Sequence, residues 1–103
     1  MRPSAPSLGL EVDFLCRNVR VDDMPIDLTA IEFGILAALA RDPGVVITRS
    51  ALLDLVWGPG FAGEDHLVDL HVANLRQKLG DDGERSQLIE MVPGFGYRLA
   101  TGA

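Results

Sequence analysis

Apolar and polar residues alternate along residues 8–28, which is the period of a β-strand with one buried face. Polar residues interrupt this alternation twice, at Arg17 and Asn18 and again at residues 22–25. The second break contains two aspartates and a proline, which favour a turn and end a strand ladder. The segment therefore predicts two to four short antiparallel strands. Their apolar positions are Leu10, Val12, Phe14, Val19, Val21, Ile26 and Leu28.

The period changes to that of a helix after Thr29. Thr29 and Glu32 have the spacing of a capping box, in which each side chain bonds the backbone amide of the other. An apolar helical stripe follows, and residues 41–44 (RDPG) end it. Its members are Ile31, Phe33, Ile35, Leu36, Leu39 and Ala40.

A second helix is predicted over residues 49–56, after a short extended link at 45–47. Thr48 is in position to cap this helix, and Trp57 is expected to close over the core at its end. The glycine-rich residues 58–63 cannot continue it. Its expected apolar face consists of Leu52, Leu53, Leu55 and Val56.

A third helix is predicted over residues 64–79, capped by Glu64 or Asp65 and closed by Gly80. At about 100° per residue its apolar and polar positions separate onto opposite faces. Residues 88–92 and 97–100 then predict a hairpin across a PGFG turn. The core-facing set of the helix is Val68, Val72, Leu75 and Leu79, and the outward set is His66, Leu70, Ala73, Asn74 and Gln77.

The length of 103 residues fits one domain around one core. We expect residues 1–7 to be a linker or disordered N-terminus and residues 8–101 to form the domain. The N-terminus lacks the apolar region of a signal peptide, and no apolar run approaches the roughly 20 residues of a membrane span. The single Cys16 excludes an internal disulfide, which suits a reducing cytoplasm. Its register with Phe14 predicts a small core residue.

Enzymatic motifs are absent from the sequence. It has no phosphate loop after a strand, no serine elbow and no paired metal-ligand motif. His66 and His71 are five residues apart, so a helix does not stack them on one face, and they are the only support for a small enzyme. We expect no catalysis, no cofactor and no metal.

The outward face of the third helix has the chemistry to bind base edges. Asn74 and Gln77 could pair bidentately with adenine, and Leu70 could contact a thymine methyl group. An ordinary amphipathic helix with a polar solvent face fits the same pattern. The net charge of −6 and the pI of about 4.6 argue against binding of polyanions by the whole surface, but they allow a local cationic patch.

Six segments together closely resemble the OmpR/PhoB-type winged-helix effector domain of bacterial two-component response regulators. They are LTAIEF at 28–33, VVITRSALL at 45–53, VWG at 56–58, VDLHV at 68–72, LRQKLG at 75–80 and GFGYR at 94–98. The resemblance covers residues 8–100 and implies an α+β fold with a four-stranded N-terminal sheet, three helices and a C-terminal wing hairpin. It also implies a sequence-specific DNA-binding transcription regulator, whose 64–79 helix enters the major groove while the 93–96 turn approaches the minor groove.

The resemblance also assigns roles to individual residues. The base-reading positions fall on Leu70, Ala73, Asn74 and Gln77. The phosphate-contacting positions include His66, Leu67, His71 and Arg76. On the helix wheel Arg76 lies on one flank and His71 and Lys78 lie on the other, and all three could contact phosphates. The wing comprises Pro93, Gly94, Phe95, Gly96 and Arg98, with Tyr97 packed beneath it and Phe95 either packed or exposed at the tip. The loop expected to contact RNA polymerase comprises Gly58, Pro59, Gly60, Phe61, Ala62, Gly63 and Glu64.

Several positions depart from the family pattern. The family often has arginine or threonine where this chain has Leu67, Ala73 and Asn74, and Pro93 replaces a wing arginine. Fewer phosphate contacts predict weak binding by the isolated domain, with dimerisation on direct-repeat or paired half-sites supplying affinity. The expected partners are double-stranded DNA, RNA polymerase and a second copy when joined to a receiver domain, in the cytoplasm and without a membrane.

Two further questions stay open at this point. The chain lacks a receiver domain, so it is either an excised C-terminal half or a stand-alone relative. The main rival function is a winged-helix protein–protein interaction module with weak or lost DNA binding, which the acidity, Pro93 and the sparse helix cations favour.

Overall fold

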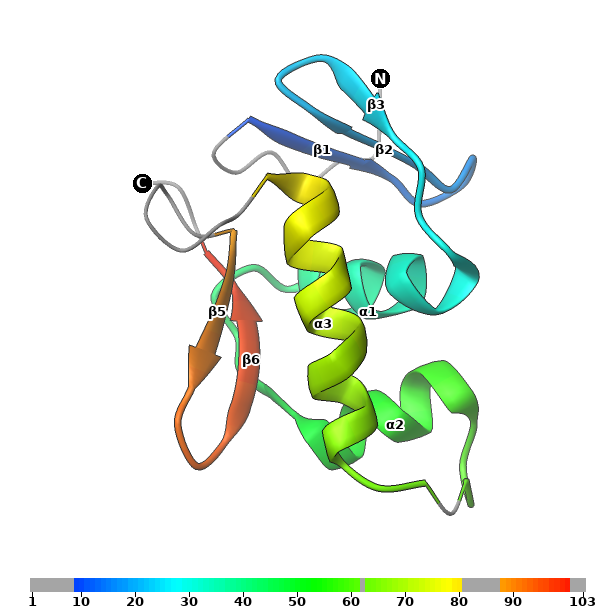
Figure 1. Cartoon of the computed structure of the whole chain (residues 1–103), viewed down its shortest axis with the longest axis vertical. Helices are drawn as coiled ribbons and strands as arrows, with labels where there is room; N and C mark the ends of the chain where they lie inside the picture. Colours follow the sequence, from blue (N-terminus) through cyan, green and yellow to red (C-terminus); the bar gives the residue numbers. More distant parts are fainter. Residues whose placement is uncertain (1–8, 62, 81–87, 101–103) are drawn as a thin grey trace.

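The computed structural model describes residues 9–61, 63–80 and 88–100, so the predicted linker and both predicted domain boundaries lie outside the described residues. The described residues form three helices and six short strands (Figure 1). In chain order these are β1 (Leu10–Asp13), β2 (Asn18–Val21), β3 (Met24–Ile26), α1 (Ala30–Arg41), β4 (Ile47–Thr48), α2 (Arg49–Trp57), α3 (His66–Leu79), β5 (Ile89–Val92) and β6 (Gly96–Leu99).

The N-terminal sheet is antiparallel, with the order β1-β2-β3. Asp22 and Asp23 both have positive φ, of 51° and 70°, which is the pattern of a tight hairpin turn. The predicted turn is thus confirmed, but it is shorter than expected because the chain is extended again from Met24. Pro25 is tolerated there because β3 lies at the edge of the sheet. The four-stranded sheet implied by the resemblance is wrong for the described residues, where three strands pair.

The fourth strand, β4, belongs instead to the C-terminal sheet, whose order is β4-β6-β5. The predicted extended link therefore ends in a strand that pairs Ile47 with Tyr97 and Thr48 with Gly96. Gly96 makes this pairing possible. A Cβ atom there would lie 2.1 Å from the Ile47 carbonyl oxygen and 2.8 Å from the Thr48 Cα. The predicted hairpin is confirmed as β5 and β6.

The helix ends follow the predicted capping residues at three of four positions. The Thr29–Glu32 capping box is present, and the Thr48 hydroxyl accepts a hydrogen bond from the Ala51 amide at 3.1 Å. Gly80 closes α3 in the left-handed conformation. Asp65 occupies the N-cap position of α3 but has helical backbone angles, and its side chain makes no capping hydrogen bond. The predicted side-chain cap of α3 is therefore wrong.

α1 lies at the centre of the molecule and contacts α2, α3 and β6. The N-terminal sheet lies at one end, and the β5–β6 hairpin runs beside α3 (Figure 1). The largest fully buried side chains are Leu10, Ile35, Leu36, Leu39, Leu52, Leu75, Ile89 and Leu99. No helix among the described residues is long and apolar enough to cross a membrane.

Two expected core residues lie on the surface. Cys16 is exposed, because the Asp13 carboxylate accepts hydrogen bonds from the amides of Leu15 and Cys16 and bends the chain into a turn. Leu55 is 62% exposed. The prediction for Cys16 was wrong because β1 ends at Asp13, so the alternation does not continue to residue 16. The prediction for Leu55 was wrong because only Leu52 and Leu53 form the buried face of α2.

Candidate nucleic-acid interface

α3 divides into the two faces that its sequence predicts. Val68, Val72, Leu75 and Leu79 are buried, so their packing fixes the rotation of the helix about its axis. The exposed positions are His66, Leu70, Ala73, Asn74 and Gln77. All four predicted base-reading residues thus lie on one exposed surface, which we call the reading face (Leu70, Ala73, Asn74 and Gln77).

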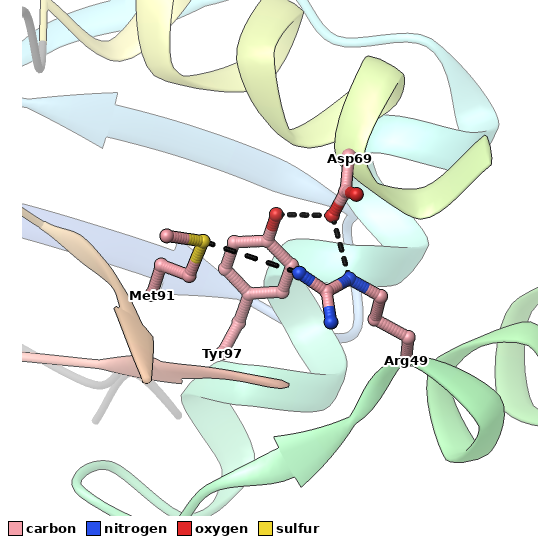
Figure 2. A network of polar contacts seen from close by, with 4 residues as sticks. All are labelled: Arg49, Asp69, Met91 and Tyr97. Carbon is pink, nitrogen blue, oxygen red and sulfur yellow. Dashed lines mark hydrogen bonds and ion pairs between the residues drawn. The ribbon is translucent and has the colours of Figure 1, made fainter. Parts of the chain in front are cut away.

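A polar network joins α3 to the hairpin and to the start of α2 (Figure 2). Asp69 accepts a hydrogen bond from Arg49 Nε at 2.8 Å and another from the Tyr97 hydroxyl. The guanidinium carbon of Arg49 lies 5.6 Å from the centre of the Tyr97 ring, and Arg49 also reaches the sulfur of Met91 at 4.0 Å. We call Arg49, Asp69 and Tyr97 the lock, because they hold three elements in one arrangement.

The electrostatics of the lock favour a charged Asp69. Burial would raise the pKa of Asp69, but the hydrogen bonds from Arg49 and Tyr97 and the Arg49 charge outweigh it, so the pKa is lowered. Burial and the bond to Asp69 raise the pKa of Tyr97. The bond to Asp69 also raises the pKa of Arg49. The lock therefore holds an ion pair and a neutral tyrosine at neutral pH.

Arg76 and Lys78, which were expected to contact phosphates, have partners inside the protein. Arg76 is half-buried, and its guanidinium donates to the Ile89 carbonyl oxygen at 2.7 and 3.2 Å. Lys78 Nζ lies 2.7 Å from Glu32 Oε1, and the Glu32 side chain is only 4% exposed. Either cation would have to leave a protein partner in order to reach a phosphate.

The Lys78 contact explains how α1 buries a carboxylate. Burial would raise the pKa of Glu32, but hydrogen bonds from Lys78 and Thr29 and the Lys78 charge outweigh it, so the pKa is lowered. Glu32 therefore serves the capping box of α1 and anchors α3 at the same time.

The loop before α3 is tied to the helix by an aromatic cluster. Trp57 is half-buried, stacks on Phe61 at 5.9 Å and meets the edge of His71 at 5.5 Å. Phe61 is 42% exposed, and Gly63 leaves room for Phe61 and Leu67 beside it. His71 of the predicted phosphate set thus packs against Trp57, while Ala62 of the predicted loop lies outside the described residues.

Polar groups at the start of α3 also have partners within the protein. His66 Nδ1 lies 2.9 Å from Glu64 Oε1, and both side chains are largely exposed. Leu67 is half-buried, and its amide donates to the Glu64 carbonyl at 3.0 Å. An incoming phosphate would therefore meet a carboxylate beside His66.

The wing turn presents an apolar tip. Phe95 is 65% exposed, whereas Tyr97 is buried as predicted. Gly94 has a φ of 82°, and the Phe95 amide donates to the Val92 carbonyl at 2.9 Å, which closes the turn. Arg98 is exposed, but its Nε lies 2.7 Å from Glu90 on the paired strand.

The sequence correctly predicted which side of α3 is exposed, but it did not predict the lock. Arg49, Asp69 and Tyr97 are separated by 20 and 28 residues, so no local pattern connects them. The available signal was a carboxylate placed on the flank of the third helix beside its apolar stripe. Within the described ranges, no group of three or more histidine, cysteine or carboxylate side chains is arranged to hold a metal ion.

The sequence profile of the family described as "Transcriptional regulatory protein, C terminal" matches residues 23–99. The chain is 42% identical over 90 residues to the transcriptional regulatory protein PrrA of Mycobacterium tuberculosis, covering 87% of this chain and 38% of PrrA. It is 41% identical over 93 residues to the DNA-binding response regulator MtrA of Mycolicibacterium smegmatis, covering 89% of this chain and 41% of MtrA. The chain thus spans about two fifths of the length of these curated relatives.

Solved structures show the same architecture. The RstA DNA-binding domain of Klebsiella pneumoniae, in complex with the RstA box, superposes with a TM-score of 0.84 at 29% identity, covering 96% of this chain and 98% of that one. The DNA-binding domain of CpxR from E. coli gives a TM-score of 0.83 at 30% identity, covering 98% and 99%. The similarity extends over the three helices and both small sheets.

Proposed function

This chain belongs to the family of C-terminal domains of OmpR/PhoB-type transcriptional regulatory proteins, and on that premise we propose that it binds double-stranded DNA sequence-specifically. It would act as the effector domain of a phosphorelay response regulator, with α3 in the major groove, and would work in the cytoplasm, where bacterial DNA lies. The family is not an enzyme class, and we propose no catalytic activity.

The observation that carries this proposal is the reading face. Its side-chain amides and apolar groups project from a helix whose opposite side is packed against the core, which supports a fixed orientation of this face before DNA binds. Asn74 and Gln77 would pair with adenine, while Leu70 and Ala73 would contact thymine methyl groups. The lock holds the wing in a set position beside this face.

Phosphate contacts would be few. His66, Leu67, His71, Arg76 and Lys78 remain proposed contacts, and each is engaged within the protein. We therefore expect weak binding by the isolated domain. Two copies on direct-repeat or paired half-sites, brought together by a receiver domain, would supply the useful affinity.

We also propose that residues 58–64 contact RNA polymerase. The partly exposed Phe61 supports this, because it is held by Trp57 against α3 and offers an aromatic surface next to bound DNA. Exposed aromatic residues are enriched at the centres of protein interfaces.

The rival function is a winged-helix protein–protein interaction module with weak or lost DNA binding. The engaged cations and the net charge of −6 favour it. The two functions differ in what the reading face contacts. Substitutions there would impair DNA binding in one case and binding of a protein partner in the other.

The deciding experiment selects binding sites from random duplexes, using a form of the chain dimerised by a fused coiled coil. Fluorescence anisotropy at two salt concentrations then compares the wild type with Asn74→Ala and Gln77→Ala. We expect each substitution to cost about 1–3 kcal/mol on the selected site and to relax specificity at one base pair. Leu55→Ala is the control, because Leu55 is also exposed but lies on α2. Absence of salt-dependent binding by the dimer would favour the rival.

A further inference from the structure

The tip of the wing exposes an aromatic ring on a closed backbone turn. The turn is closed by the hydrogen bond from the Phe95 amide to the Val92 carbonyl. Pro93 restricts its own φ, and Gly94 takes the left-handed conformation that the turn requires. Exposure of 65% leaves the ring of Phe95 free to contact another molecule, at little further cost in backbone entropy.

This tip lacks a free positive charge among the described residues. Arg98 is the cation of β6, and its guanidinium is paired with Glu90. Arg49 and Arg76, on the α3 side of the hairpin, are bound to Asp69 and to the Ile89 carbonyl. A narrow, strongly negative minor groove attracts inserted cations. The wing is therefore poorly suited to recognise such a groove by charge.

The hairpin is also fixed relative to α3. Tyr97 binds Asp69 in the first turns of the helix, and Arg76 binds Ile89 near its end. The wing turn consequently lies level with the first turn of α3 (Figure 1). On the proposed function, a helix in the major groove would bring this tip to the adjacent minor groove.

We propose that Phe95 is an apolar wedge, which contacts the sugar edges and enters a base step of the minor groove. Apolar side chains that insert there unstack and kink the duplex, and pyrimidine–purine steps such as TA and CA deform most easily. The wing then favours sites with a flexible base step, because less energy is needed to deform the duplex there. It does not select a narrow A-tract by charge. This inference rests on the proposed function.

The test uses duplexes with the selected α3 site held constant and either TA or AA placed at the step under the wing. We expect wild type to prefer the TA duplex and Phe95→Ala to bind it about 10-fold more weakly with little remaining preference. The salt slope should not change, because no phosphate contact is lost. Phe95→Arg should instead steepen the log–log slope by nearly one unit and shift the preference toward AA.

A second measurement reports insertion directly. With 2-aminopurine at the step, wild type should raise its fluorescence on binding, and Phe95→Ala should not. Leu55→Ala removes an apolar side chain of similar exposure, 62%, from a remote surface and should behave as wild type. If the wild type binds the duplexes and Phe95→Ala keeps the same affinity and step preference, the wedge is wrong but the proposed function stands. Failure of wild type to bind any duplex would overturn the proposed function, and the wedge with it.

Discussion

Gly96 occupies a position where only a hydrogen atom fits between two strands. Replacing it with alanine would place a methyl group 2.1 Å from the Ile47 carbonyl oxygen, so the pairing of β4 with β6 would have to open. We expect Gly96→Ala to lower the free energy of unfolding by about 2–4 kcal/mol in a urea titration.

Gly94 is the matched control for this substitution. Its φ is 82°, but a Cβ there would meet no atom within 4 Å. Gly94→Ala should cost only the strain of a left-handed alanine, about 1 kcal/mol. Equal losses for the two variants would show that close approach of β4 is not what requires a glycine at 96.

Lys78 stabilises the fold through the buried carboxylate of Glu32. We expect Lys78→Gln to cost about 1–2 kcal/mol near pH 7, because the buried carboxylate of Glu32 loses its positively charged partner. The pKa of Glu32 is lowered in the folded state, so this stabilisation is present above the unfolded pKa and is lost as pH falls through the folded one. Urea midpoints of the two proteins should therefore converge only at acid pH, below the ordinary pKa of a glutamate side chain.

The ion pair of Arg98 and Glu90 is a control that tests whether burial, and not the distance between the charges, sets the contribution to stability. Its nitrogen and oxygen also lie 2.7 Å apart, but the Glu90 side chain is 37% exposed against 4% for Glu32. Arg98→Gln should change stability by less than about 0.5 kcal/mol at any pH. A larger loss than for Lys78→Gln would contradict this assignment.

At the scale of elements, the lock couples the orientation of the wing to that of α3. Tyr97→Phe keeps the ring but removes the hydroxyl, and we expect a loss of about 1 kcal/mol. Asp69→Ala should cost about 2 kcal/mol, since Arg49 and Tyr97 both lose their acceptor. The double variant should cost less than the sum of the two, by about 1 kcal/mol, in thermal or urea unfolding. Additive losses would show that the two side chains act independently.

The elements themselves were largely predictable because their signals are local. Thr29, Thr48 and Gly80 mark helix ends through contacts within four residues, and the stripe of α3 depends only on helical geometry. The errors occurred where a nearby polar group or tertiary packing determines the local backbone conformation. Asp13 bends the chain at Cys16, and the strand that pairs with β4 lies about fifty residues further along the sequence.

The sequence predicted which residues of the candidate site are exposed, but it did not predict which of its cations are paired. Exposure of Asn74 and Gln77 follows from the wheel, whereas the partners of Arg76 and Lys78 lie 13 and 46 residues away. Whether a cation is free or engaged depends on those long-range contacts. The sequence therefore overstated the number of cations available to phosphates.

Over the whole molecule, negative net charge and engaged cations predict an unusually shallow salt dependence. Glu90→Gln should release Arg98 at the wing and steepen the log–log slope of DNA affinity by nearly one unit. Glu11→Gln makes the same change in net charge beside Arg20, on the N-terminal sheet. Its slope should remain that of the wild type. Equal steepening by both variants in anisotropy titrations would mean that net charge, rather than position, controls binding.

The turn between β1 and β2 gives the molecule a natural attachment point. This turn lies on the opposite side of the molecule from the wing turn (Figure 1), and it carries Cys16, the chain's single thiol, which is exposed. A maleimide dye would therefore react at one defined position without replacing any residue of the reading face or the lock. Energy transfer from that dye to a labelled duplex end would reveal in which direction the protein lies along its site.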